Sequence, residues 1–293
     1  MFKRWHWLFL ASLVWLHGLG CRAEKNPEQA EWRLELIWET ARELATPESV
    51  FPDTLRDAIY VANINGNPGE KDGNGFISRL TADGRIDSLH WVTGLNAPKG
   101  MAMLGDTLYV ADIDHLVVID IPAAKIVARH PAQEAKFLND VAVTAQGTVV
   151  VSDYSANSAI YQLQPQGLEL WLQGDSLNRP NGLYRSGDRL IVGNSGEGCL
   201  RAWRESNPTL EKLACPEHAI DGIAGDLHGN LYFSNWAGKI EVLNRTGEIA
   251  LLLDTSAEKV QAADISIWPQ KDLLLVPTFS DHRVMAYRIH YGD

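Results

Sequence analysis

The sequence predicts an all-β protein folded as a six-bladed β-propeller with four-stranded blades, and two observations lead to this prediction. Six short strand-like segments end at positions 63, 112, 153, 194, 235 and 278, so that successive ends lie 49, 41, 41, 41 and 43 residues apart. Strand-forming residues fill these segments, as in LYVAD and VVVSD, and no helical periodicity lies between them. One strand-rich unit repeated at an even spacing is typical of a repeat architecture. A β-sandwich is the alternative, although it does not require six equal repeats.

The blades can be bounded in chain order, and the last one is incomplete. The expected blades cover residues 48–94, 98–131, 138–174, 180–216, 220–255 and 263 to the C-terminus. The last blade has only three strand signals, whereas residues 32–40 (WRLELIWET) resemble the final strands of other blades. We therefore expect this N-terminal strand to complete the sixth blade and close the ring, which leaves only short, protected sheet edges.

Composition and charge narrow the class of partner. The chain has 293 residues, 45% of them hydrophobic and 22% charged, with a formal net charge of −11 and no cluster of Lys and Arg to offset it. This balance argues against nucleic acid and against an anionic membrane surface as the main partner. We expect a monomer that acts on, or binds, a small molecule.

The first residues are typical of an export signal rather than of the propeller. A basic start precedes the apolar run of residues 7–16, which is too short to span a bilayer. The small residues before Cys21 resemble the bacterial lipobox, in which that Cys is lipidated and becomes the mature N-terminus. This predicts export to the periplasm or cell envelope, with a membrane anchor through Cys21; a cleaved soluble signal is the alternative. The predicted divisions are a signal peptide (1–21), a flexible tether (22–31) and the propeller (32–293).

Two further cysteines predict a disulfide. Cys199 and Cys215 lie symmetrically about Asn207, which belongs to a turn signal between two strand-like segments. Antiparallel strands joined at that turn would place the two sulfur atoms opposite each other. Two buried free thiols are the alternative.

A polar residue stands at the start of each predicted first strand. First strands line the channel of a propeller, so these residues should converge on its axis although they are far apart in the sequence. The six residues are Glu48, Lys99, Asn139, Asn181, Asp221 and Asp264. Carboxylates and amides without Cys or His suit Ca²⁺ first, with Mg²⁺, Mn²⁺ or Zn²⁺ as alternatives, and do not match a structural zinc site. We expect a divalent metal site here; the alternative is that each side chain only bonds its own loop backbone.

Short motifs around these residues resemble the gluconolactonase/regucalcin (senescence marker protein) family of propellers. The motifs are TPESV with IYVAN, FLNDVAV with VVVSD, RPNGL with LIVGN and AIDGI with LYFSN. In that family the Glu, the Asn of Asn-Gly and the Asp of Asp-Gly bind a divalent metal, usually Ca²⁺, and the Asp is the proposed base. The resemblance therefore implies metal binding at Glu48, Asn181 and Asp221, catalysis by Asp221, and an Asn139 that contacts metal-bound water or substrate.

Two departures from the family pattern concern the substrate. Phe137 stands two residues before Asn139, where members often have an Arg that helps to hold a sugar. Lys99 brings an ammonium group to the same channel, where it is expected to hold a substrate carboxylate or to stabilise an oxyanion. The alternatives for Lys99 are that it replaces the cation or that it extends to solvent at the rim.

Other polar features have simpler interpretations. The insertion at residues 64–75 accounts for the single long interval and is either a lid over the site or a solvated variable loop. The polar ends of the second strands are interpreted as turn caps: Asn63, Asp112, Asp153, Asn194 and Asn235. Three histidines are expected on the same face, as loop residues or proton carriers: His115, His218 and His282.

Two functions are compatible with these observations. The first is an exported, metal-dependent hydrolase of a lactone or small ester, in which water attacks a metal-polarised carbonyl. The second is a non-catalytic propeller of the cell envelope that binds a small molecule or a protein partner, because a propeller fold does not by itself select a function.

Overall fold

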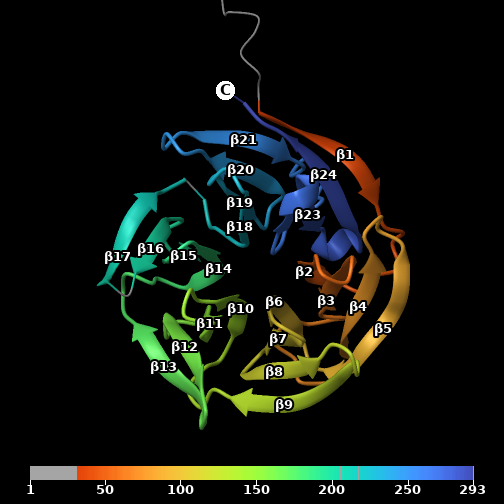
Figure 1. Cartoon of the computed structure of the whole chain (residues 1–293), viewed down its shortest axis with the longest axis vertical. Helices are drawn as coiled ribbons and strands as arrows, with labels where there is room; N and C mark the ends of the chain where they lie inside the picture. Colours follow the sequence, from red (N-terminus) through yellow and green to blue (C-terminus); the bar gives the residue numbers. More distant parts are fainter. Residues whose placement is uncertain (1–31, 205, 217, 293) are drawn as a thin grey trace, which may run out of the picture.

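Six four-stranded antiparallel sheets stand in a ring around one axis (Figure 1). The computed structural model describes residues 32–204, 206–216 and 218–292. The six-bladed propeller predicted from the sequence is confirmed. The predicted signal peptide, the tether and Cys21 lie outside the described residues. Within those residues no helix is long and apolar enough to span a bilayer.

In blades 1 to 5 the four strands follow one another in sequence from the axis outward. Blades 1 and 2 contain β2 (Pro47–Asp53), β3 (Ala58–Asn63), β4 (Gly75–Thr81), β5 (Ile86–Leu95), β6 (Pro98–Leu104), β7 (Thr107–Asp112), β8 (His115–Asp120) and β9 (Lys125–Pro131). Blades 3 and 4 contain β10 (Leu138–Val143), β11 (Val149–Asp153), β12 (Ala159–Gln164), β13 (Gly167–Gln173), β14 (Pro180–Ser186), β15 (Arg189–Asn194), β16 (Leu200–Arg204) and β17 (Asn207–Ala214). Blade 5 contains β18 (Ile223–Gly225), β19 (Leu231–Asn235), β20 (Lys239–Leu243) and β21 (Ile249–Asp254).

Blade 6 joins the two ends of the described chain. It contains β22 (Ser266–Trp268), β23 (Leu273–Pro277) and β24 (Val284–His290), and its outer strand is β1 (Arg33–Glu39). β1 pairs antiparallel with β24, from Arg33 opposite His290 to Glu39 opposite Met285. The predicted closure by the N-terminal strand is therefore confirmed.

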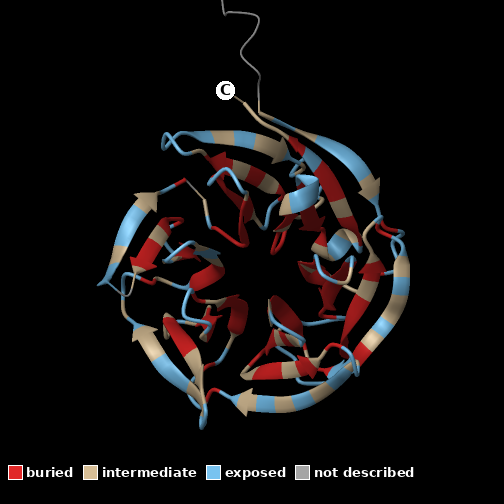
Figure 2. Ribbon diagram, viewed as in Figure 1, coloured by how far each residue is buried: buried red, intermediate tan, exposed pale blue. Residues whose placement is uncertain are grey.

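Burial falls from the axis outward (Figure 2). Every residue of β11 is buried, whereas the outer strand β9 alternates between exposed and half-buried positions. An outer strand with one face in solvent shows this alternation, and an inner strand enclosed on both faces does not. The sequence of each strand thus matches its place in the blade.

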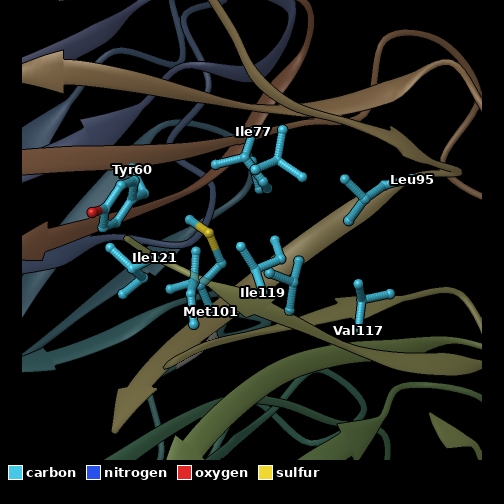
Figure 3. Close-up of a cluster of buried hydrophobic side chains, with 11 residues drawn as sticks. Tyr60, Ile77, Leu95, Met101, Val117, Ile119 and Ile121 are labelled. Carbon is cyan, nitrogen blue, oxygen red and sulfur yellow. The ribbon is translucent and has the colours of Figure 1, made fainter. Parts of the chain in front are cut away.

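The hydrophobic core consists of layers between neighbouring blades rather than one central mass. The layer between blades 1 and 2 contains Tyr60, Ile77 and Leu95 from the first blade and Met101 and Ile119 from the second (Figure 3). Five similar clusters join the other pairs of neighbours, including the pair formed by blades 6 and 1. Burial of each large apolar side chain contributes about 1.5–3 kcal/mol, so each blade is stabilised through both of its neighbours.

A disulfide links the two outer strands of blade 4. Leu200 of β16 pairs with Ala214 of β17, and the residues just beyond this pair, Cys199 and Cys215, are bonded to each other. The link closes a loop with a sequence separation of 16 residues. A cross-link of this length restricts the unfolded chain more than the folded one.

We expect the double variant Cys199→Ser/Cys215→Ser to lose roughly 2–4 kcal/mol of unfolding free energy, because the unfolded chain regains loop entropy. Urea titrations with and without dithiothreitol measure the effect. The double variant also serves as the control, because dithiothreitol should not change the urea midpoint of a protein that lacks this disulfide. An unchanged wild-type midpoint in reductant would contradict the stabilising role.

Candidate functional site

Four of the six polar residues near the starts of the first strands lie in β-bulges, whereas Asp221 and Asp264 lie just before β18 and β22. In blades 1 to 4 the pairing between first and second strands shifts register at Pro47/Ser49, Pro98/Met101, Leu138/Val141 and Pro180/Leu183. A bulge leaves residues out of the regular pairing and redirects their side chains. The residues inside these four shifts include Glu48, Lys99, Asn139 and Asn181.

Glycine follows three of the site residues, Lys99, Asn181 and Asp221, where neighbouring first strands meet. A Cβ atom on Gly100 would lie 2.5 Å from the Cα atom of Asp140. A Cβ atom on Gly182 would lie 2.5 Å from the carbonyl oxygen of Asp221. A Cβ atom on Gly222 would lie 2.4 Å from the backbone nitrogen of Ile265. Only glycine fits these contacts, so the Asn-Gly and Asp-Gly motifs allow the blades to approach each other at the axis.

One cavity of about 370 Å³ brings five of the six predicted residues together. Its polar lining includes Glu48, Lys99, Asn139, Asn181 and Asp221. The sixth residue, Asp264, departs from the prediction. It lines a separate cavity of about 660 Å³, together with Asp140. Asp264 accepts a 2.6 Å hydrogen bond from the Ser49 hydroxyl instead of joining the other five.

Two buried oxygen atoms of the site lack a hydrogen-bond partner among the described residues. They are Oε2 of Glu48 and Oδ1 of Asn139. Beside them, the Asn181 amide nitrogen donates a 2.7 Å hydrogen bond to Oδ1 of Asp221. Buried acceptors are normally satisfied, and carboxylate and amide oxygens are the donors that Ca²⁺ prefers. The chemistry of this donor set therefore fits a divalent cation.

The centre of the ring holds more buried carboxyl groups than buried basic groups. Burial raises the pKa of Asp221 to about 6 and that of Asp140 to about 7. Burial, and next the neighbouring Asp221 carboxylate, raises the pKa of Glu48 well above its ordinary value. Asp264 is shifted in the same direction, first by burial and then by the Asp140 carboxylate. A cation at this place would stabilise the ionised forms of these groups.

Lys99 is buried, so the alternative in which it extends to solvent is wrong. Its side chain is 1% exposed, and Nζ donates hydrogen bonds to the carbonyl oxygens of Ala97 (2.9 Å) and Pro68 (3.0 Å). Nζ also lies 4.4 Å from the centre of the Phe137 ring. Burial lowers the pKa of Lys99 to about 8, and the Glu48 carboxylate acts in the opposite direction. The bulge and these contacts hold the ammonium inside the ring.

The insertion at residues 64–75 covers one edge of the cavity through its first part. Ile64 and Pro68 line the cavity, and the Pro68 carbonyl is the one bonded by Lys99. The segment beyond Pro68 is mostly exposed, with Lys71 paired to Asp114. The first part of the insertion is thus held at the edge of the site by the hydrogen bond from Lys99, and its outer part is exposed to solvent.

The three histidines do not line the cavity. His115 pairs with Asp114 at 2.7 Å, His218 pairs with Glu241 at 2.7 Å, and His282 accepts a 3.2 Å hydrogen bond from the Thr46 backbone. His218 and His282 are loop residues, as one interpretation had it, whereas His115 is the first residue of β8.

The polar ends of the second strands cap turns, as expected. In blades 1 to 3 the capped turn precedes the first strand, whereas Asn194 and Asn235 accept from N–H groups just after their own strands. Asn63 accepts from the Ala45 N–H at 2.9 Å, and Asp153 accepts from the Phe137 N–H at 3.1 Å. Asp112 accepts from the backbone of Asn96 and Ala97 in the same way. The channel residues are therefore held in place by caps on the neighbouring strand.

Sequence reasoning missed most of the cavity walls. Five wall residues each directly follow the polar residue that ends a repeated second-strand segment of the sequence: Ile64, Tyr154, Ser195, Trp236 and Phe279. The repeat itself contains this signal, because the position after the polar cap recurs in every blade. Ser195 donates a 2.8 Å hydrogen bond to the Ile220 carbonyl, which holds the wall beside Asp221.

Comparisons with known proteins agree with the architecture. A scan against protein-family models found no match, and neither did a search of curated proteins. Among solved structures, a protein assigned as a gluconolactonase is similar at 14% identity, over 88% of this chain and 92% of its own, with a TM-score of 0.65. A catalytically inactive variant of virginiamycin B lyase from Staphylococcus aureus, with quinupristin, is similar at 14% identity over 88% and 99% of the two chains (TM-score 0.62). The β-propeller domain of Cps50 (Swd1) from Myceliophteria thermophila is similar at 10% identity over 88% and 100% (TM-score 0.63).

These likenesses show a shared fold. The identities of 10% to 14% leave the function to be argued from the site. A gluconolactonase and a lyase are both among the proteins with this architecture, so the fold is one that enzymes of different reaction types use.

In EDTA, we expect the unfolding free energy to fall as pH rises from about 4 to 7. The folded protein keeps protons on Asp221 (pKa about 6) and Asp140 (pKa about 7) that the unfolded chain has released, with an ordinary pKa of 3.8. Groups with a raised folded pKa contribute stability that is present below the unfolded pKa and lost as pH rises through the folded pKa. Urea unfolding across this range measures the slope.

Asp221→Asn should flatten that slope between about pH 4 and 6, because the titrating group is removed. The matched control is Asp175→Asn, which removes an exposed carboxylate outside the channel. A slope in Asp221→Asn equal to that of the control would contradict a raised folded pKa for Asp221.

Proposed function

We propose that this protein is a metal-dependent hydrolase of a lactone or small ester and a member of the gluconolactonase/regucalcin-like propellers. The observation that carries the proposal is the meeting of two unpartnered oxygens, on Glu48 and Asn139, with the hydrogen-bonded pair Asn181 and Asp221 in one cavity. Similarity in fold to a protein assigned as a gluconolactonase supports it.

The chain supplies the ligands and a base. Glu48, Asn181 and Asp221 would hold the divalent ion, most simply Ca²⁺, which when bound polarises a carbonyl and lowers the pKa of water. Asp221 is also the carboxylate proposed to take a proton from the attacking water, and a cation beside it would keep it ionised for that role. The water oxygen adds to the carbonyl carbon, the ring C–O bond breaks, and the departing oxygen takes up the proton. One lactone and one water thus give one hydroxycarboxylic acid.

Asn139 and Lys99 have supporting roles in this proposal. The unpartnered Oδ1 of Asn139 can accept a hydrogen bond from the attacking water and orient it. Lys99 commits two N–H donors to backbone carbonyls, and an ammonium group has three. The third donor can stabilise negative charge that develops on the carbonyl oxygen.

One observation, the burial of Lys99 near Glu48, favours the non-catalytic alternative. Lys99 is a buried cation whose charge already favours ionised Glu48. If the Lys99 ammonium fully offsets the charge of Glu48, no metal ion is needed there, and the cavity would bind a small neutral molecule. Metal content and turnover therefore decide between the two functions.

We expect purified protein to hold close to one divalent ion per chain, and Glu48→Gln and Asp221→Asn to lose it, because each variant removes a charged ligand. Asp221→Asn should also lower kcat/KM on a lactone panel by about 10²–10⁴-fold, with no loss of melting temperature in EDTA. Metal mass spectrometry, hydrolysis assays and thermal melts measure these effects.

Asp175→Asn is again the control and should keep both the ion and the rate. Wild-type protein that holds no ion and hydrolyses no lactone or ester would contradict the hydrolase and leave the binding function. Turnover that survives in Asp221→Asn would contradict the role of this residue.

Export and lipidation remain part of the proposal. The disulfide between Cys199 and Cys215 supports export, because such bonds persist in oxidising compartments such as the bacterial periplasm. We expect the mature protein in the membrane fraction with an acylated N-terminal Cys21, detected as a lipid-modified peptide by mass spectrometry. Cys21→Ser should abolish the modification. An unmodified N-terminus in the soluble fraction would contradict the anchor.

A further inference from the structure

The walls of the cavity differ in chemistry from its floor. Four aromatic side chains line it, Phe137, Tyr154, Trp236 and Phe279, together with the aliphatic Ile64 and Ile220. The predicted ligand and catalytic groups are all 8% exposed or less and come from the starts of the first strands or, for Asp221, from the residues just before one. The walls come instead largely from the residues that follow the second strands. A substrate therefore meets polar groups at one end and aromatic surface along its sides.

The aromatic side chains form two pairs on opposite sides of the ring. Phe137 and Tyr154 belong to blade 3, and their ring centres lie 5.8 Å apart. Trp236 and Phe279 belong to blades 5 and 6, and their ring centres lie 5.6 Å apart at an interplanar angle of 74°. Blade 3 lies across the axis from blade 6 (Figure 1). The two pairs thus face the channel from both sides, which suits a flat or chain-like apolar group between them.

Few polar side chains lie beside the aromatic walls, and two of them already donate hydrogen bonds to the backbone. Lys99 donates to two backbone carbonyls and lies over Phe137, and Ser195 donates to the Ile220 carbonyl. The Tyr154 hydroxyl and the Trp236 indole N–H are the polar side-chain groups of the four aromatics. Burying a substrate hydroxyl without a hydrogen-bond partner is unfavourable, so these walls do not suit a polyhydroxylated ring.

We infer that the substrate class is a lactone or ester with an apolar alkyl or aryl substituent, rather than a sugar lactone. The carbonyl would lie on the floor, near Asp221 and Asn139, and the substituent between the aromatic pairs. A cavity of about 370 Å³ falls in the usual range for small-molecule sites, roughly 300–1,000 Å³. This inference rests on the proposed hydrolase for its reaction and on the cavity walls alone for its ligand chemistry.

Two series of probes test it. The first is a set of γ-lactones whose side chain lengthens from methyl to hexyl, with D-gluconolactone for comparison, assayed by kcat/KM. The second is the matching set of γ-lactams, which hydrolyse slowly and report affinity by calorimetry whether or not the protein is an enzyme. We expect each added methylene to raise kcat/KM and lactam affinity on the order of fourfold. D-gluconolactone should be on the order of a hundredfold poorer than the hexyl lactone.

Variants of one wall residue test whether the aromatic walls cause the preference for longer alkyl chains. Trp236 is 50% exposed, so Trp236→Ala can be made without disturbing the core. This variant should reduce the increase in kcat/KM and in lactam affinity that each added methylene gives. Trp236→Phe keeps an aromatic ring and should restore most of the gain. Leu227→Ala removes an exposed apolar side chain that does not line the cavity, and it should leave the gain unchanged.

The outcomes separate the inference from the proposed function. Lactam affinity that rises with chain length, without turnover of any lactone, would support the apolar ligand class and contradict the hydrolase. D-gluconolactone hydrolysed better than the hexyl lactone, with lactam affinity independent of chain length, would overturn the inference and leave the hydrolase standing. Absence of lactam binding, or an equal gain per methylene in Trp236→Ala, would also overturn the inference.

Discussion

The packing of each blade against its two neighbours is the interaction on which the whole structure depends. A four-stranded sheet with apolar side chains on both faces cannot bury them alone, and each hydrophobic layer here is shared between adjacent blades. Every blade has both of its apolar faces covered only if the ring closes, because an open ring would expose the apolar faces of its two end blades to water. Pairing of β1 with β24 completes blade 6, and the layer between blades 6 and 1 then buries Val50, Ile59 and Leu275. A short N-terminal strand therefore stabilises far more than its own hydrogen bonds.

Closure of the ring also explains how so many charges come to lie at its centre. Each first strand starts at the axis, so one polar residue per blade is sufficient to build a cluster. Burial of Glu48, Asp140, Asp221 and Asp264 is unfavourable in isolation, and Lys99 is the buried ammonium among them. The interblade layers supply the stability that permits this arrangement. Functional centres commonly concentrate strain or charge that the surrounding scaffold must offset.

The site divides into two parts that the fold controls differently. The floor is set by bulged first strands and by glycines that let neighbouring strands touch, so its geometry is tied to the ring itself. The walls come from loops that follow the second strands, together with the insertion fastened to Lys99. Loops can change without disturbing interblade packing. This division agrees with the finding that a gluconolactonase, a lyase and a Cps50 domain are all similar in fold.

The sequence alone determined the number of blades, their order, the closing strand and the convergence of five polar residues. These follow from a repeated spacing and from local strand and turn preferences, which depend on residues close together in the chain. Tertiary structure alone decided how individual side chains are directed. Asp264 bonds to Ser49 across 215 positions, and Lys99 bonds to Pro68 across 31. The meeting of the aromatic walls was likewise decided by the tertiary structure, because Phe137 and Phe279 line one cavity only after the ring closes. Contacts between distant residues depend on bulges and on the rotation between blades, and no local pattern records either of these.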